Sequence, residues 1–132
     1  MPAVNAAIEG KVYPEGTFEV DAEHVAGFAA SVGQALKGVP PTFVTVAEFG
    51  VFGPIMDDPE LALDFSRVVH TDQEYVWHRP LVVGETLVVG SRIASIRERG
   101  GHGFLTIEVS LTAEDGEAVA TTFATLLERA AG

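Results

Sequence analysis

The segment from Thr42 to Phe52 limits the possible folds more than any other part of the chain, because it is apolar on nearly every side. Pro40 and Pro41 precede it and are suited to the first positions of a helix, where the backbone N–H has no intrahelical partner. A helix without a polar face has to be enclosed by other elements. The segment therefore predicts a central, buried helix, with Glu48 as its one charged residue.

Helix-breaking residues mark the expected end of this helix. Gly50, Gly53 and Pro54 follow one another closely, and glycine and proline both weaken a helix interior. The acidic stretch at 57–60 comes next and is typical of a loop. We therefore expect the helix to end near Gly53.

From Val68 onward the hydrophobic period changes to two, which indicates strands with one buried face. Leu105 and Ile107, for example, fall on one face of their segment, while Thr106 and Glu108 fall on the other. Asp115-Gly116 is typical of a hairpin turn between the last two strands. The expected strands lie at about 68–78, 86–97, 103–113 and 118–128.

Two further elements are expected before the central helix. Residues 16–20 alternate weakly and predict a short strand, and Asp21 is well placed to cap a helix from Ala22 to near Gly33. The assembled prediction is an α+β fold in one domain spanning residues 1–132. It consists of an antiparallel sheet of about five strands wrapped around a central apolar helix, which is the outline of a hotdog fold. The periodicity alone also allows other α+β arrangements.

Charge and cysteine content exclude several classes of function. The chain has no cysteine, which excludes disulfides, thiolate catalysis and cysteine-ligated metal centres. Eight basic residues against 19 acidic ones give a net charge of −11, which repels phosphate backbones and anionic lipids. We therefore expect no nucleic-acid partner. An acidic carrier protein would need a local basic patch, for which Arg92, Arg97 and Arg99 are the candidates.

The N-terminal pattern, the lengths of the apolar runs and the spacing of the histidines bear on the location of the protein and on its cofactors. Residues 1–4 show no pattern of an export signal, and no apolar run approaches the roughly 20 residues of a membrane span. A cytoplasmic protein with no membrane contact is the expectation. The four histidines lack metal-ligand spacing, so we expect neither a metal nor another cofactor.

One segment carries a family resemblance. Residues 69–81 read VHTDQEYVWHRPL, and VGETL follows at 83–87. This run resembles the signature of the MaoC-like dehydratase N-terminal (FAS1-like dehydratase) family, which is close to V-H-G-E-Q, then Y-H-R-P-L and A-G-D-x-L. Further counterparts, in the family's order and spacing, cover almost the whole chain: residues 10–14, 39–43, 99–105 and 125–129.

The resemblance implies a reaction and an assembly. In this family the hotdog domain is commonly half of a double hotdog, formed as a homodimer, a fused tandem or a heterodimer. The implied reaction is the reversible removal of water from a 3-hydroxyacyl thioester carried by coenzyme A or an acyl carrier protein. The acyl chain would lie beside the central helix.

The catalytic residues of the family are not matched here. Active members carry an Asp and a His in a D-x-N-P-x-H segment between the two helices, where they act as general acid and base. The corresponding interval, Ser31–Pro40, contains neither residue. The resemblance therefore implies the non-catalytic, substrate-holding subunit of a heterodimeric (3R)-hydroxyacyl-thioester dehydratase.

Even spacing offers weak catalytic candidates in the strand at 68–78. On a regular strand His70, Asp72, Glu74 and His78 would share one face, opposite Thr71, Gln73, Tyr75 and Trp77. His70 with Asp72 could then be a displaced acid–base pair. The alternative interpretation is a solvated or interface-facing polar strand face.

Six residues are candidates for substrate binding: Pro41, Thr42, Phe43, Gln73, Tyr75 and Trp77. Thr42 and the backbone N–H groups after Pro41 belong to a helix start, which can stabilise a developing oxyanion, although threonine there is more often only a cap. Gln73 lines the acyl tunnel, cross-links its strand to the central helix, or is only a buried amide with satisfied hydrogen bonds. The three aromatic residues either line the tunnel or belong to the core.

Three hypotheses remain open. The chain is a dehydratase subunit that needs a catalytic partner, a homodimer that binds an acyl or polyketide ligand without turnover, or a self-sufficient lyase that uses His70, Asp72 or His78 on a secondary metabolite. All three imply a dimer, because a lone hotdog sheet leaves an edge strand exposed.

Overall fold

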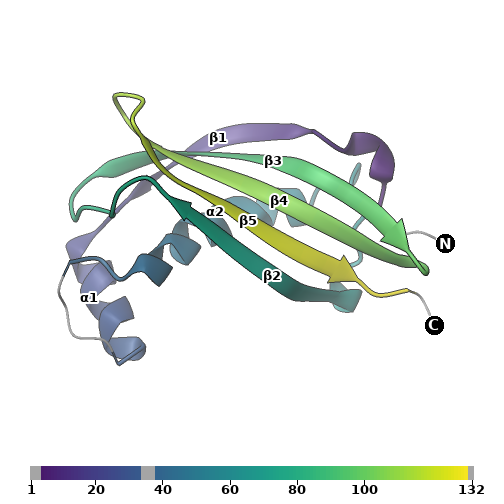
Figure 1. Cartoon of the computed structure of the whole chain (residues 1–132), viewed down its shortest axis with the longest axis horizontal. Coiled ribbons are helices and arrows are strands. Elements are labelled where there is room, and N and C mark those ends of the chain that lie inside the picture. Colours follow the sequence, from purple (N-terminus) through teal and green to yellow (C-terminus); the bar gives the residue numbers. More distant parts are fainter. Residues whose placement is uncertain (1–3, 34–37, 131–132) are drawn as a thin grey trace.

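The computed structural model describes residues 4–33 and 38–130 and contains one antiparallel sheet of five strands (Figure 1). The interval Ser31–Pro40 is thus described only in part, and residues 1–3 of the N-terminal segment lie outside the described residues. The strand order is β1-β3-β4-β5-β2. The strands are β1 (Val12–Glu19), β2 (Val68–Trp77), β3 (Thr86–Arg99), β4 (His102–Ala113) and β5 (Ala118–Glu128).

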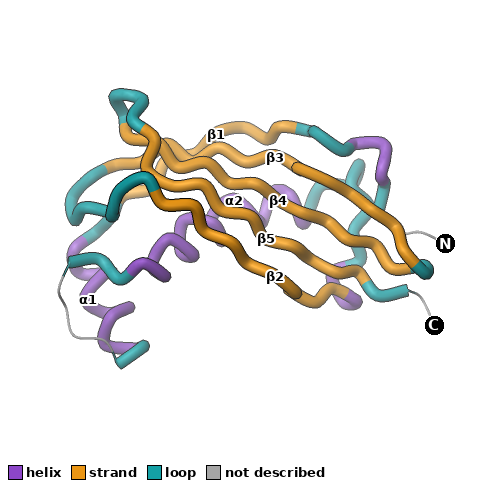
Figure 2. Tube along the Cα trace, in the orientation of Figure 1, coloured by secondary structure: helices purple, strands orange, loops and turns teal. Residues whose placement is uncertain are grey.

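The central helix α2 (Val44–Met56) lies across one face of this sheet, and α1 (Ala22–Ser31) lies beside its N-terminal end (Figure 2). Apolar residues of α2 and of the facing side of the sheet form the core; Ile55, Ile93 and Ile107 are all fully buried. This arrangement confirms the predicted hotdog fold. Within the described ranges, no helix combines the length and the apolar character that crossing a membrane demands.

The start of the chain's first helix follows the prediction, whereas the end of the central helix does not. The side chain of Asp21 accepts a hydrogen bond from the backbone N–H of His24, as expected of a cap. The central helix continues past Gly53, and Pro54 lies inside it. Pro54 removes one backbone hydrogen bond at an exposed position, while the fully buried Ile55 anchors the last turn.

The first strand is longer than predicted. It begins at Val12 rather than Gly16 and pairs with β3, with an irregularity between Tyr13 and Gly16. Pro14 lies within this irregular part, where its missing N–H breaks the pairing. Because β1 is an edge strand, the sheet tolerates a proline there.

A bulge in β2 changes which residues share a face. The pairing with β5 shifts between His70 and Asp72, so that Thr71 is an extra residue. His70 lies opposite Leu126 and Gln73 opposite Ala124, both on the α2 side, whereas Asp72 lies opposite Thr125 on the other side. The prediction that His70 and Asp72 share a face is therefore wrong, because one inserted residue reverses the alternation of the strand.

The Asp58 carboxylate ties the loop after α2 to the start of the first strand, and Glu60 also pairs with Lys11. Asp58 Oδ2 accepts hydrogen bonds from Lys11 Nζ and from Tyr13 Oη, each at 2.7 Å. These hydrogen bonds hold the pKa of Asp58 down to about 2, from an ordinary value of 3.8. The C-terminal end of α2 is thereby fixed relative to β1.

We predict that Asp58→Asn lowers the melting temperature at pH 7 by a few degrees. In the wild type the stabilising effect of Asp58 is complete above pH 3.8 and is lost as the pH falls toward 2, because the folded state binds the proton less readily than the unfolded state. Melting curves of both proteins between pH 7 and pH 2.5 should therefore converge in acid. Asp57→Asn, at the exposed neighbour, is the control, and an equal loss in that variant would contradict the role of Asp58.

Candidate functional site

Helix α2 and the edge strand β2 run side by side in opposite directions, and polar contacts join them at two levels. Near the start of α2, Thr45 Oγ1 lies 2.7 Å from Tyr75 Oη. One helical turn later, Gln73 Nε2 donates a hydrogen bond of 2.9 Å to Glu48 Oε2. We call the space between the two elements the α2–β2 seam.

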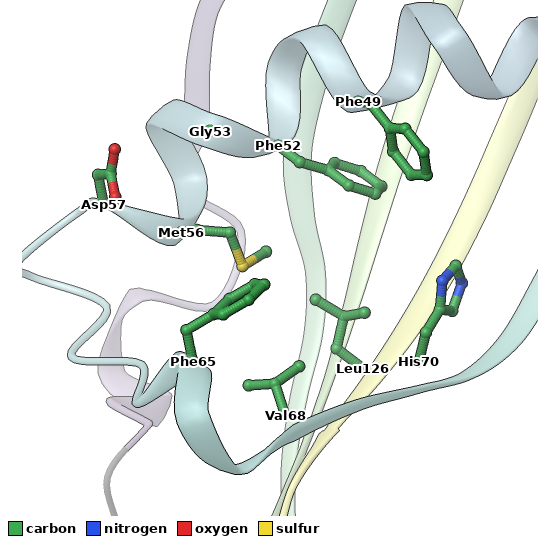
Figure 3. Close-up of a pocket in the computed structure, with 9 residues that line it drawn as sticks. All are labelled: Phe49, Phe52, Gly53, Met56, Asp57, Phe65, Val68, His70 and Leu126. Carbon is green, nitrogen blue, oxygen red and sulfur yellow. The ribbon is translucent and has the colours of Figure 1, made fainter.

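An apolar pocket of about 700 Å³ lies at the end of the seam that contains the C-terminal part of α2 (Figure 3). Figure 3 shows the His70 ring directed from β2 toward the α2 side, where Phe49 and Phe52 lie. Phe49 and Phe65 are 61% and 68% exposed, so the pocket opens at the surface of the single chain. Its lining residues are Phe49, Phe52, Gly53, Met56, Asp57, Phe65, Val68, His70 and Leu126.

A second pocket, of about 260 Å³, lies at the other end of the seam. Two predicted substrate-binding residues, Pro41 and Trp77, line it together with His78. Thr42 is exposed beside Pro41, in the short turn Pro41–Phe43 that leads into α2. The helix start and the end of β2 are therefore close together.

Phe43 belongs to the core rather than to a pocket wall. It is fully buried, and its ring centroid lies 5.4 Å from that of Phe28 and 5.9 Å from that of Phe18. His24 lies edge-on to the same ring at 5.1 Å. Phe43 thus fixes the start of α2 against α1 and β1, which corresponds to the core alternative of the sequence interpretation.

The arginine of the H-R-P-L segment holds the loop between β2 and β3. Arg79 forms ion pairs with Glu85 at 2.7 Å and with Glu117 at 2.8 Å. Its hydrogen bonds to these carboxylates raise the pKa of the guanidinium further above its ordinary value. This loop forms part of the wall of the smaller pocket, so the ion pairs of Arg79 hold that part of the wall in place.

Glu48 is fully buried in the middle of the seam. Its Oε2 atom accepts hydrogen bonds from Gln73 and, at 2.7 Å, from Thr122 Oγ1, whereas Oε1 has no hydrogen-bond partner among the described residues. Burial raises the pKa of Glu48, and the two hydrogen bonds and the nearby His70 oppose that shift. The sequence singled out Glu48 as a lone charge and Gln73 as a possible link to the central helix, and the Gln73–Glu48 hydrogen bond is such a link. It contained no signal for Thr122.

The structure separates the three weak catalytic candidates. His70 Nε2 lies 3.0 Å from the backbone carbonyl oxygen of Asp72, and no hydrogen bond or ion pair joins the ring to the Asp72 carboxylate in the described part of the chain. His78 lies at the opposite end of the seam from His70. Across residues 4–33 and 38–130, no three His, Asp or Glu side chains gather closely enough to hold a metal ion.

The sequence of the chain is similar to that of a known family. Residues 7–122 match the family model described as the FAS1-like dehydratase domain region. A UPF0336 protein of Streptomyces coelicolor is 36% identical over 146 aligned positions, which cover 98% of this chain and 97% of the relative. A UPF0336 protein of Parafrankia is 37% identical, with coverage of 98% and 96%.

Solved structures share the fold. A chain of the HadBC (3R-hydroxyacyl-ACP dehydratase) complex of Mycobacterium tuberculosis is 26% identical, with a TM-score of 0.78 over 91% of this chain and 96% of that chain. A MaoC-like dehydratase gives a TM-score of 0.79 at 22% identity, over 95% of this chain and 43% of that chain. The ChsH1–ChsH2 complex of Mycobacterium tuberculosis gives 0.71 at 17% identity, with coverage of 92% and 86%.

We predict that Glu48→Gln changes how stability depends on pH. Because the pKa of Glu48 is raised in the folded state, ionisation of this buried carboxyl group lowers the free energy of unfolding. This loss grows as the pH rises above 4.5 and through the folded pKa. The wild type should therefore lose stability relative to Glu48→Gln as the pH rises from 4.5 toward 8. Urea unfolding at several pH values measures this difference.

The control for this experiment is Glu108→Gln, which removes a carboxylate paired with Arg92 on the opposite side of the sheet. A constant difference between wild type and Glu48→Gln across the whole pH range would contradict the raised pKa of Glu48.

Proposed function

Because this chain belongs to the FAS1-like dehydratase family, we propose that it is one subunit of a (3R)-3-hydroxyacyl-thioester dehydratase. In this proposal the chain holds the acyl group, and a second hotdog subunit supplies the catalytic Asp and His. The proposal rests on the large apolar pocket that the seam offers beside α2. It agrees with the positions of His70 and Asp72, which lie on opposite faces of β2 and form no dyad.

The pocket is suited to an acyl chain. Its volume of about 700 Å³ lies within the range of small-molecule sites, and aromatic and aliphatic side chains form most of its wall. Each methylene group that leaves water for such a wall contributes roughly 0.8 kcal/mol. Affinity would therefore come mainly from the length of chain that the seam covers.

The opposite end of the seam is suited to the thioester. A helix start carries a partial positive charge, which favours negative charge developing on a thioester carbonyl oxygen. Pro41 and Thr42 lie at this start, and Trp77 is part of the adjacent pocket wall. We assign the thioester to this end, with the partner's base removing the proton at C2 and the partner's acid protonating the departing C3 hydroxyl.

The edge of the sheet gives the reason for a partner subunit. Strand β2 is an edge strand, with unpaired backbone groups along one side. Large apolar side chains are exposed along β2 and α2, among them Val69 at 44%, Val76 at 39% and Phe49 at 61%. The relatives HadBC and ChsH1–ChsH2 are complexes of two kinds of chain, which supports a hotdog partner here.

The first test is turnover. The chain is assayed for hydration of crotonyl-CoA and trans-2-dodecenoyl-CoA, alone and with a catalytic hotdog subunit from the same genome. We expect no loss of enoyl absorbance with the chain alone and turnover with the pair. Turnover by the pure chain would contradict the proposal, and binding without turnover in any combination would favour the acyl-binding homodimer.

The second test concerns the assembly. Replacing Val69 and Val76 together by lysine should weaken association with the partner at least roughly tenfold, because two charges would be buried at the interface. Replacing Val82 and Val83 by lysine is the matched control, since these residues are similarly exposed but lie in the loop before β3. Sedimentation velocity measures both, and equal association in the two variants would refute an interface along β2.

A further inference from the structure

The apolar pocket of the seam ends at a polar barrier. Phe52, in the pocket wall, follows Glu48 by one helical turn and so lies on the same side of α2. On the sheet, His70 and Leu126 belong to the pocket wall, and Gln73 with Ala124 is the next pair on the same face. The Glu48–Gln73 contact is therefore the next layer of the seam toward the helix start, and an acyl chain that spans both pockets has to pass it.

Glu48 is an unexpected residue for this position. Buried polar atoms in proteins are nearly always hydrogen-bonded, and one left without a partner costs about 1–3 kcal/mol. Within residues 4–33 and 38–130, Glu48 Oε1 is such an atom, since Gln73 and Thr122, which donate to this carboxyl group, both bind Oε2. An apolar residue would suit the rest of the helix, so the carboxyl group calls for a reason other than folding.

The kind of group that would satisfy Oε1 follows from its chemistry. If Glu48 is ionised, Oε1 needs a hydrogen-bond donor. If Glu48 is protonated, the proton resides on Oε1 and needs an acceptor, because Oε2 already accepts two hydrogen bonds. A hydroxyl group donates and accepts, and so meets both cases, whereas a methylene chain meets neither.

We infer that Glu48 is a specificity residue that binds a hydroxyl group of the acyl chain, at a position beyond the reacting C2 and C3 carbons. The substrate class would then be acyl thioesters with a hydroxylated chain rather than plain saturated chains. This inference rests on the proposed acyl-holding function. Access to Oε1 requires a neighbouring side chain to turn aside, and Phe52 is the partly exposed candidate in the pocket wall.

Calorimetric binding to the full-length chain tests the inference. The probes are dodecanoyl-CoA and a series of monohydroxydodecanoyl-CoA thioesters with the hydroxyl at each position from C5 to C12. The wild type should bind at least one regioisomer roughly tenfold or more tightly than dodecanoyl-CoA, as expected for one hydrogen bond to a carboxyl group. Equal affinity for all probes would overturn the inference without any variant.

Variants separate recognition of the hydroxyl from a purely structural role. Glu48→Leu should abolish the preference for the hydroxylated probe, and Glu48→Gln should retain part of it, because an amide also binds a hydroxyl. Thr122→Val is the matched control, since it removes a donor to Oε2 but leaves Oε1 in place, and should keep the preference. A preference that survives in Glu48→Leu would overturn the inference.

The same titrations distinguish a failure of the Glu48 role from a failure of the proposed acyl-holding function. If the wild type binds dodecanoyl-CoA but shows no hydroxyl preference, the role of Glu48 falls and the acyl-holding function stands. If the wild type binds none of the thioesters, the proposed function falls and the role of Glu48 falls with it.

Discussion

One apolar helix has to be enclosed, and the sheet and its exposed edge are arranged around it. Helix α2 has almost no polar face, and a single sheet can cover only one side of it. The buried Val44, Ala47 and Ile55 pack toward the sheet, while Phe49 remains 61% exposed. The exposed apolar side and the edge strand β2 lie together, so one partner subunit can cover both. The fold and the proposed assembly thus follow from the same requirement.

Polar groups along α2 make the seam a candidate for selective binding. A seam lined only by apolar residues would bind an acyl chain without regard to its substituents. The Thr45–Tyr75 and Glu48–Gln73 contacts interrupt the seam at two depths, and Glu48 Oε1 has no hydrogen-bond partner in the part of the chain that the structure describes. Functional sites commonly keep such unfavourable groups at the expense of stability. The stability penalty at Glu48 and the proposed selectivity therefore have one physical origin.

Periodicity and capping residues allowed most of the fold to be predicted. The four period-two segments became β2 to β5, with ends within about two residues, and Asp21 caps α1 as expected. The bulge at Thr71 could not be predicted, because it depends on the register between β2 and β5. For the site, Gln73 was recognised as a possible link to the central helix, but Thr122 comes from a strand 74 positions away from Glu48 and no local pattern connects them.

If this chain holds an acyl group in the α2–β2 seam, a photo-crosslinking acyl probe should label the residues of that seam. Dodecanoyl-CoA with a diazirine at the far end of its chain is bound to the full-length protein and irradiated, and the labelled peptides are identified by mass spectrometry. Labels are expected on α2 and on the facing residues of β2 and β5, around Phe52, His70 and Leu126. Labels confined to the opposite side of the sheet, around Arg97 and Phe104, would contradict acyl binding in the seam.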